Sequence, residues 1–549
     1  MAQVPDLDFV VRSIAHLNPR VLAGLLSWLN RRWDDGVQQS EDQAQLAYGV
    51  FPRGPLLDAV VNQLLMEDED HVWWVPPAGL YGMRLLSEHW PQPDFAPGTS
   101  CSVDLLSKWL LHLTGLVSES IGGPGHQDES VSWVSWELGN WFVNSTEDRL
   151  GLFARTAWLL FAEREPNIVG SPNYIDVEAE LTELLGIGPL AYLSLLVGVY
   201  SSLVAPEHPP AHIEIAWEQW QKTALTEREF EVSLNRAAID AEGIAERFAE
   251  TERLAGGTPL NILPFAEKPL LRLPDGTYIC PSIRLLVQHV RDGLYHLLWN
   301  TYRDRAGRPD NRFTRFWGEL VESYVRVLLK HTIPATGPMQ IVWFGRDAKY
   351  DDGQQEAVDV IIEHPQELIF IEVTATALTL QSVCLGEPAA TRRDLQNSIV
   401  GKAAQLSRCI DDFRRGCIDF GKPAPSVDKP IVPVVVTPGF TPSFPPSQVH
   451  IRGEMAKQKL LEQRGVLPLQ VCSLGDIEMI LNYAAADCSV GDLLGEKARS
   501  ESTHAQGSFA EWMADTEMAA PTRRHTLLSE VFRAFFARIT ETLFPREIV

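Results

Sequence analysis

Three carboxylates of the chain lie at positions where a charged side chain is unusual. Asp359 lies in a run otherwise rich in Ala, Val and Ile (356–364), and Glu372 lies in the middle of the apolar run LIFIEVTAT (368–376). Glu322 lies in the middle of a predicted helix, within GELVESYV. A carboxylate is costly to bury among apolar side chains unless it is paired, hydrogen-bonded or bound to a metal. Each acid also has an ordinary interpretation: an exposed helix face, a turn cap or a buried ion pair.

The chemistry that these acids predict is the binding of one hard cation. The two apolar runs are joined by the tight turn HPQE (364–367), so they are expected to pair as a hairpin and to bring Asp359 and Glu372 together. Mg²⁺ prefers oxygen ligands and keeps several waters, so two or three carboxylates suffice to hold it. Such an ion can orient a water and stabilise charge on a phosphoryl oxygen.

The elements that must position these residues form a recognisable order. Apolar residues at helical spacing predict a helix over 312–331, and a second, long helix is predicted over 391–415. Runs of β-branched and aromatic residues predict strands over 339–346, 356–364, 368–376, 430–439 and 467–474, with a short helix near 453–463 and a last helix from 475. The order α-β-β-β-α-β-(α)-β-α predicts a mixed α/β sheet with helices on its faces.

This order, with acids at these positions, resembles the PD-(D/E)XK nuclease superfamily, which has the restriction-endonuclease-like fold. The resemblance covers roughly residues 312–482. In that family a glutamate of the first helix, a strand aspartate and a (D/E)-x-K on the next strand build the site. Glu322, Asp359 and Glu372 occupy the corresponding places. The resemblance implies hydrolysis of phosphodiester bonds in DNA or RNA with Mg²⁺ or Mn²⁺, held by Asp359 and Glu372 with Glu322 as an outer ligand.

The chain departs from the family pattern at one position. The family lysine belongs two residues after Glu372, where this chain has Thr374. In some members the lysine comes from the following helix, and Lys402 is placed for that role, with Gln405 on the same helix face as a candidate nucleic-acid contact. The alternative is a catalytically inactive, nuclease-like scaffold or sensor that binds nucleic acid or partner proteins.

Charge argues at first against nucleic acid. The chain of 549 residues carries 72 Asp and Glu against 47 Lys and Arg, a formal net charge of −25, and affinity for phosphate normally comes from cations. Residues 310–440, however, carry a net of only −3. The helix over 391–415 is rich in basic residues and would line a phosphate path through Arg392, Arg393 and Arg408, although the same residues also suit a solvated helix.

We expect a multidomain α + α/β protein. Its predicted parts are a mainly helical, Trp-rich region (1–255), a β-hairpin and helix connector (256–310), the restriction-endonuclease-like mixed α/β sheet domain (311–485) and a polar, loop-rich tail that ends in a helix (486–549). The tryptophans are expected to fill helix interfaces, or alternatively to form a surface for other protein subunits. A large helical module on a nuclease-like domain is similar in layout to prokaryotic antiviral defence and restriction proteins, by analogy alone.

The remaining patterns bear on location and on other chemistries. The uncharged stretch 184–205 is broken by Gly186, Gly188 and Pro189, so it predicts a buried core helix rather than a membrane span. Seven cysteines without a CxxC pattern, and no signal-peptide pattern in the first residues, favour a cytoplasmic protein without membrane contact. Phosphate-binding glycine loops and the motifs HExxH and GxSxG do not occur.

Overall fold

The first half of the chain is mostly helical in the computed structural model, as the apolar periodicity predicts. The structure describes residues 6–545 except 15, 35–39, 65–73, 90–101, 122–148, 205–214, 216, 256–260, 274–275, 307–310, 334–339, 351–355, 386, 421–424, 440–444, 485–487, 503–504, 506 and 517–524. Its first elements are α1 (Leu7–Ile14), α2 (Pro19–Asp34), α3 (Ser40–Val50), α4 (Pro55–Leu64), α5 (Pro76–Glu88), α6 (Val103–Ile121), α8 (Arg149–Phe161), α9 (Pro166–Val169), α10 (Val177–Leu185), α11 (Pro189–Val204), α12 (Trp217–Trp220), α13 (Glu227–Ala237), β1 (Ala238–Asp240), α14 (Ala241–Ala255) and α15 (Leu263–Glu267).

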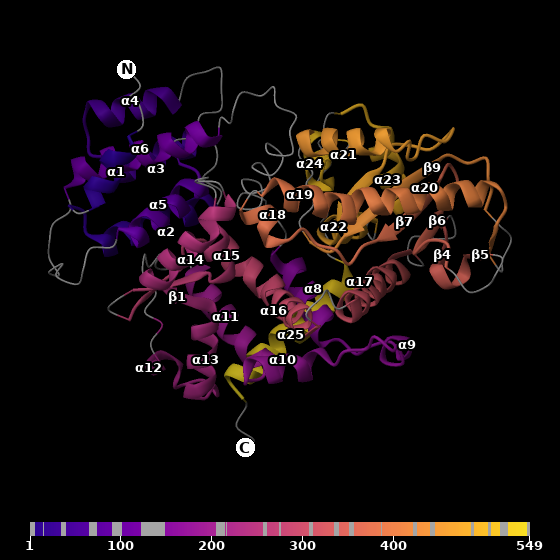
Figure 1. Ribbon diagram of the computed structural model, residues 1–549, viewed down its shortest axis with the longest axis horizontal. Helices are drawn as coiled ribbons and strands as arrows, with labels where there is room; N and C mark the ends of the chain where they lie inside the picture. Colours follow the sequence, from indigo (N-terminus) through magenta and orange to yellow (C-terminus); the bar gives the residue numbers. More distant parts are fainter. Residues whose placement is uncertain are drawn as a thin grey trace.

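Strands are concentrated in the second half, where they alternate with helices (Figure 1). The elements there are β2 (Leu270–Arg272), β3 (Tyr278–Ile279), α16 (Ile283–Ala306), α17 (Asn311–Thr332), β4 (Ile341–Phe344), η2 (Gly345–Asp347), β5 (Lys349–Tyr350), β6 (Val360–Glu363), β7 (Leu368–Val373), α18 (Leu380–Cys384), α19 (Pro388–Leu395), η3 (Gln396–Val400), α20 (Gly401–Arg414), β8 (Ile418–Asp419), β9 (Ile431–Thr437), α21 (Pro445–Lys457), β10 (Gln470–Ser473), α22 (Leu474–Ala484), α23 (Val490–Arg499), α24 (Phe509–Asp515) and α25 (Thr526–Leu543). The molecule thus combines a large helical part with a mixed α/β part.

Two apolar cores organise the helical part. The first core joins α1–α6 to α14, α15, the hairpin β2–β3 and α18. Two tryptophans lie inside it without exposure, and each donates its indole N–H to a protein oxygen: Trp74 to Asn30 Oδ1 at 3.2 Å and Trp109 to the Val10 carbonyl at 2.9 Å. For these two residues the core interpretation holds. The cluster EDED and the Trp-rich run 131–141 lie outside the described residues.

The second core extends from α8 to the last helix of the chain. It contains apolar side chains of α8, α10, α11, α16, α17 and α25, together with one face of the large sheet. In Figure 1 the last helix, α25 in yellow, lies among α8, α10 and α16. The described residues of 486–525 also contain helices α23 and α24 where loops were predicted. Two features explain this difference. A capping box at Ser489 starts α23. Lys497 of α23, which looks like a surface residue in the sequence, is buried and donates to Gln470 and to the Ala505 carbonyl.

The uncharged stretch 184–205 is a bent pair of helices. Gly186 ends α10 with a left-handed φ of 71°, and α11 then leaves at an angle of 73° to α10. Most of α11 is buried in the second core. Among the described residues no single helix is long and apolar enough to cross a membrane, although this bent pair passes that test when its two helices are joined.

The large sheet has the strand order β10-β9-β7-β6-β4. Strands β4, β6 and β7 form an antiparallel meander, whereas β7, β9 and β10 are parallel to one another. The meander matches the predicted hairpin, and the parallel strands are buried along their whole length as their continuous apolar sequences predict. The predicted short hairpin is also present, with β2 antiparallel to β3.

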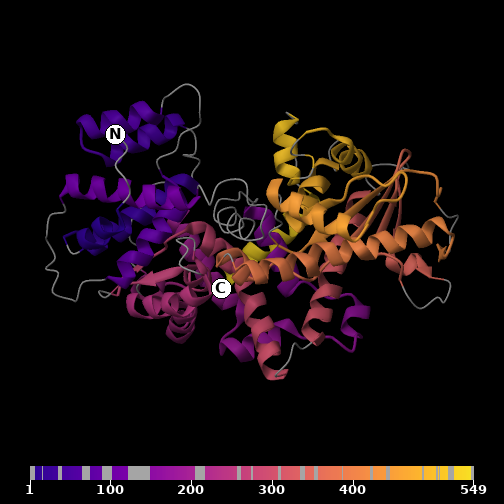
Figure 2. The ribbon, with the colours of Figure 1, turned by 45° about the horizontal axis from the view of Figure 1, so that its top comes forward.

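Helices cover both faces of this sheet, and Figure 2 shows the long helix α20 crossing in front of the strands. Alternate side chains decide the face: Ile361 and Phe370 pack against α20, whereas Ile362 and Ile371 belong to the second core with α17. Two predicted segments differ. No helix is predicted between the strand that ends at 376 and the helix that begins at 391, yet α18 lies there, because Thr379 caps it through the Ser382 N–H.

The helix predicted at 453–463 lies instead at Pro445–Lys457. Its two leading prolines suit the first turn of a helix. It cannot continue to 463, because Lys459 and Leu461 have left-handed φ values of 54° and 59°.

Candidate active site

The register of the β6–β7 hairpin brings two of the predicted acids together. Val360 pairs with Ile371, and one further step along the antiparallel pair places Asp359 opposite Glu372. Asp359 lies just before β6, and its Oδ2 accepts a 2.7 Å hydrogen bond from the Val373 N–H. Both acids therefore lie on the same face of the sheet as Phe370, the face that α20 covers.

Helix α20 supplies the positively charged side chain of the candidate site, Lys402. Leu406, Cys409 and Phe413 of α20 pack on the sheet at helical spacing, and Lys402 continues this stripe by one turn. Its Nζ lies 2.8 Å from Glu372 Oε2. The sequence placed Lys402 near the acids, and in the structure it pairs with one of them directly.

A π-helical turn precedes Lys402. The helix from Pro388 to Arg414 is continuous but widens over Gln396–Val400, immediately before α20 begins. A π turn inserts one extra residue, so the side chains that follow it are rotated about the helix axis by about 100° relative to those of an uninterrupted α-helix. The direction in which Lys402 points therefore depends on this turn.

Glu322 of α17 joins the site from a different direction. With Asp359 it lines a small cavity of about 320 Å³, part of which is open solvent. Arg326 and Glu356 line the same cavity. Arg326 also pairs with Glu165 at 3.1 Å, which ties the α17 side of the cavity to the segment before α9.

The electrostatics of the four groups are those of crowded, buried acids. Burial and the charge of Asp359 raise the pKa of Glu322 to about 8. Burial raises the pKa of Asp359, against the effect of Lys402, and burial and Asp359 together hold the pKa of Glu372 well above its usual range. Burial lowers the pKa of Lys402, but Glu372 and Asp359 outweigh it, so the lysine stays charged.

Two observations test whether these residues suit a divalent cation. Glu372 is fully buried, yet its Oε1 has no hydrogen-bond partner among the described residues, so one carboxylate oxygen is left for another ligand. Raised pKa values of neighbouring acids also fit a site whose charge a cation would balance. Within the described part of the chain, however, no set of three or more His, Cys, Asp or Glu side chains already has metal-site geometry. The donor set that fits is therefore the pair Asp359 and Glu372, with waters completing the shell.

Thr374, the residue that stands in place of the family lysine, has a structural role. Its N–H donates to the Val436 carbonyl at 2.9 Å, which continues the pairing of β7 with β9. Its buried hydroxyl oxygen accepts a 3.0 Å hydrogen bond from the Thr376 N–H. This bond helps to fix the backbone conformation just after β7.

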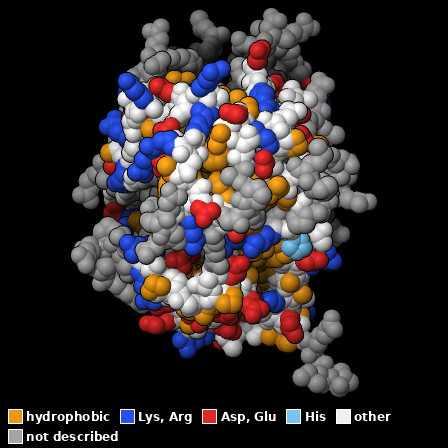
Figure 3. Space-filling view, turned by 90° about the vertical axis from the view of Figure 1, so that its right-hand side faces the viewer, with side chains coloured by type: hydrophobic (Ala, Val, Ile, Leu, Met, Phe, Trp, Pro, Cys, Tyr) orange, Lys and Arg blue, Asp and Glu red, His pale blue; other side chains and the backbone are white. Residues whose placement is uncertain are grey.

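The residues predicted to contact nucleic acid differ in their solvent exposure. Arg392, Arg393 and Arg408 are exposed, whereas Gln405 is half-buried and close in sequence to Lys402. Figure 3 looks at the end of the molecule where α20 ends, and Lys and Arg side chains gather in the upper left part of this face. Asp and Glu side chains are more frequent in its lower part.

Sequence reasoning missed Arg326 and Glu356. Arg326 lies four residues after Glu322 and so on the same helix face, which is a signal that spacing does contain. Glu356 was included in a predicted strand but was not distinguished from an ordinary polar residue. The structure identifies it, because it lines the cavity and because its Oε2 comes so close to Gly345 that a Cβ atom there would clash with it.

Comparisons of this chain with family models, with curated proteins and with solved structures return no match.

Proposed function

We propose that this protein is a metal-dependent nuclease of the PD-(D/E)XK type that hydrolyses phosphodiester bonds of DNA or RNA. One observation carries the proposal: Glu322, Asp359, Glu372 and Lys402, which come from four different elements, converge at one end of the β6–β7 hairpin. Three acids and one lysine rarely gather around a fully buried carboxylate such as Glu372 for stability alone, because desolvation opposes each charge.

In this proposal each residue has a separate task. Asp359 and Glu372 hold Mg²⁺ or Mn²⁺, and Glu322 binds a water of its shell. When bound, the cation supplies positive charge to the phosphoryl oxygens and orients the attacking water. Lys402 keeps its proton beside Glu372 and offers that charge to the developing negative charge at phosphorus. Arg392, Arg393 and Arg408 hold the backbone of the strand, with Gln405 nearer the acids.

The wider setting follows from the same features. Free cysteines in the described part of the chain suit a reducing cytoplasm. The helical part is large enough to bind other subunits, and a role in prokaryotic defence or restriction is an analogy of layout.

Cleavage and cation binding test the proposal together. Purified full-length protein is assayed with Mg²⁺ and Mn²⁺ on single- and double-stranded DNA and RNA. We expect Asp359→Ala and Glu372→Ala to abolish cleavage, and Lys402→Met to slow it by about 10²- to 10⁴-fold. The matched control is Lys457→Met, at an exposed lysine on α21 whose ion-pair partner among the described residues is Glu454; it should leave the rate unchanged.

Binding is measured separately from activity. At a Mg²⁺ concentration of ten times its Kd, the free energy of unfolding should rise by about 1.4 kcal/mol in the wild type and not in Asp359→Asn. Cleavage that persists in both alanine variants would point to contamination or to another site. Equal stabilisation of Asp359→Asn by Mg²⁺ would reject the ligand assignment.

The second candidate is a nuclease-like scaffold that binds nucleic acid or a partner without cleaving. It is favoured by Thr374 and by the fact that, among the described residues, no set of three or more His, Cys, Asp or Glu side chains has metal-site geometry. Nucleic-acid binding by wild type and Lys402→Met alike, with no cleavage of any substrate, would select this candidate.

A further inference from the structure

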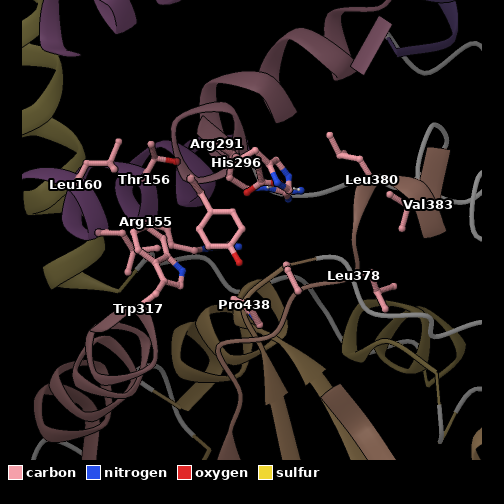
Figure 4. A pocket seen from close by; sticks show the side chains of 15 residues that line it. Arg155, Thr156, Leu160, Arg291, His296, Trp317, Leu378, Leu380, Val383 and Pro438 are labelled. Carbon is pink, nitrogen blue, oxygen red and sulfur yellow. Dashed lines mark hydrogen bonds and ion pairs between the residues drawn. The ribbon is translucent and has the colours of Figure 1, made fainter. Parts of the chain in front are cut away.

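A second cavity lies where the helical part meets the sheet, and we call it the junction pocket. It is lined by residues of α8, α16, α17 and α18 and by the segments that follow β7 and β9. Figure 4 shows Arg155 and Trp317 on one side of it and Leu380 on the opposite side. The carboxyl ends of parallel strands at a change in strand direction are a common place for ligands in α/β sheets. Here β7 is that strand, with antiparallel β6 on one side and parallel β9 on the other.

The pocket is open enough for a small organic molecule. The empty space among its lining residues is about 730 Å³, which includes open solvent at the mouth. A ligand would therefore lie partly in the mouth.

Three aromatic side chains present polar atoms to this pocket. Tyr295, His296 and Trp317 line it, and none of them makes a hydrogen bond to a described residue. Their rings contact one another, with centroids 5.2 Å apart for Tyr295 and His296 and 5.0 Å apart for Tyr295 and Trp317. A hydroxyl, an imidazole and an indole N–H in one cavity can therefore donate to or accept from a ligand that enters it.

Two arginines also line the pocket, together with the carboxylate of Asp292. Arg155 is buried and holds Glu478 through Nε at 2.7 Å, and Arg291 holds its neighbour Asp292 at 2.7 Å. Both guanidinium groups line the pocket while their paired carboxylates fix their positions. A planar guanidinium held in this way is suited to a phosphate.

We propose that the junction pocket binds a nucleotide, with its base among Tyr295, His296 and Trp317 and its phosphate beside Arg155 or Arg291. Hydroxyl, imidazole and indole groups supply both donors and acceptors to the edges of a base, and the rings offer faces for stacking. The nucleotide has two possible sources with the same chemistry: a free mononucleotide, or an unstacked nucleotide of a bound strand. This inference goes beyond the proposed nuclease and does not require cleavage.

The pocket is connected to the candidate active site through two elements. Trp317 lies on α17 five residues before Glu322, and Ala377 follows Glu372 by five residues on the chain that leaves β7. A Cβ at Gly318 would be 3.5 Å from the Ala375 side chain, so these two elements are in contact between the sites. An occupant of the pocket therefore contacts both segments that position the acids.

Calorimetry with defined probes tests the proposal. Wild-type protein is titrated with AMP, with adenosine, with inorganic phosphate and with a single-stranded hexanucleotide, all without divalent cation. We expect AMP or the hexanucleotide to bind with a Kd tighter than about 1 mM, and adenosine and phosphate to bind at least about tenfold more weakly. AMP binding identifies a free nucleotide as the source, and binding of the hexanucleotide alone identifies a strand.

The variants keep the ring contacts and remove polar atoms. Tyr295→Phe should weaken binding of the probe by roughly two- to tenfold, and the double variant Tyr295→Phe/His296→Phe by about tenfold or more. Tyr48→Phe is the control, because Tyr48 is exposed on α3, far along the chain from the pocket. Wild type that binds neither AMP nor hexanucleotide overturns the proposal, as does unchanged affinity in the double variant. AMP has no phosphodiester bond and is titrated without divalent cation, so its binding is read independently of the nuclease proposal.

Discussion

At the scale of single residues, Glu322 makes the candidate site sensitive to pH. Its pKa is about 8 in the folded protein, raised by burial and by the charge of Asp359 from an ordinary value of 4.5. Between pH 4.5 and about pH 8, Glu322 is therefore protonated in the folded state and ionised in the unfolded state. Folded-state stability falls as pH rises through this window, because the folded protein must either keep the proton or bury a charge.

This dependence gives a prediction for protein without divalent cation. The urea midpoint of wild type should fall from about pH 5 to about pH 8, and Glu322→Gln should flatten that fall, since an amide cannot ionise. The exposed residue Glu530 on α25 provides the control variant Glu530→Gln, which should behave like wild type. A Glu322→Gln protein with the full wild-type pH dependence would show that another group titrates.

How far the sequence predicts the site differs from residue to residue. Asp359 and Glu372 could be identified because an acid inside an apolar strand is a strong local signal, and strand alternation then fixes their common face. Lys402 could be placed only approximately, since its direction depends on a π turn that helical periodicity does not reveal. Tyr295 and His296 could not be singled out, because the pocket that they line is built from segments remote from one another in sequence.

At the scale of elements, three helices are held together by a buried polar cluster. Arg155 of α8 donates to both carboxylate oxygens of Glu478 on α22, at 2.7 and 3.2 Å, and Tyr324 of α17 donates to the same carboxylate at 2.7 Å. Nothing in the apolar periodicity predicts this cluster, although Glu478 within the apolar run EMILNYA is the kind of exception that marked the other acids. The order of elements from 312 to 482 was predictable because each has a distinct pattern, but helix ends fixed by prolines or left-handed residues were not.

The cluster predicts a difference between single and double substitution. Glu478→Gln should lower the free energy of unfolding by about 3 to 5 kcal/mol, because it leaves the Arg155 charge buried without its anion. The pair Arg155→Met/Glu478→Leu should cost much less, since it removes both charges together. Denaturant unfolding of the three proteins measures this. Equal losses in the single and double variants would show that packing, rather than charge, holds these helices.

At the scale of the whole molecule, the last helix belongs to the second core rather than to an independent tail. Leu528, Phe535, Ile539 and Leu543 of α25 are buried in that core, against α8 and α11. We expect Phe535→Ala to destabilise the whole α/β and helical assembly by about 3 to 5 kcal/mol. The exposed neighbour Arg533 gives the control Arg533→Ala, with a change within about 0.5 kcal/mol. A Phe535→Ala protein in which only α25 frays, with an unchanged main unfolding transition, would contradict this picture.

The same packing of α25 has a consequence for synthesis. The second core includes Leu152 and Leu543, roughly 390 residues apart, which at about 5 to 20 residues per second separates their emergence by about 20 to 80 s. The apolar faces of α8 and α11 therefore lack this partner until α25 (Thr526–Leu543) has been synthesised. The first core, whose last contributions come from α18, can close earlier. A ribosome that stalls before residue 526 would thus release a chain in which the first core is complete and the second core still exposes apolar surface. Chaperones bind chains of this kind.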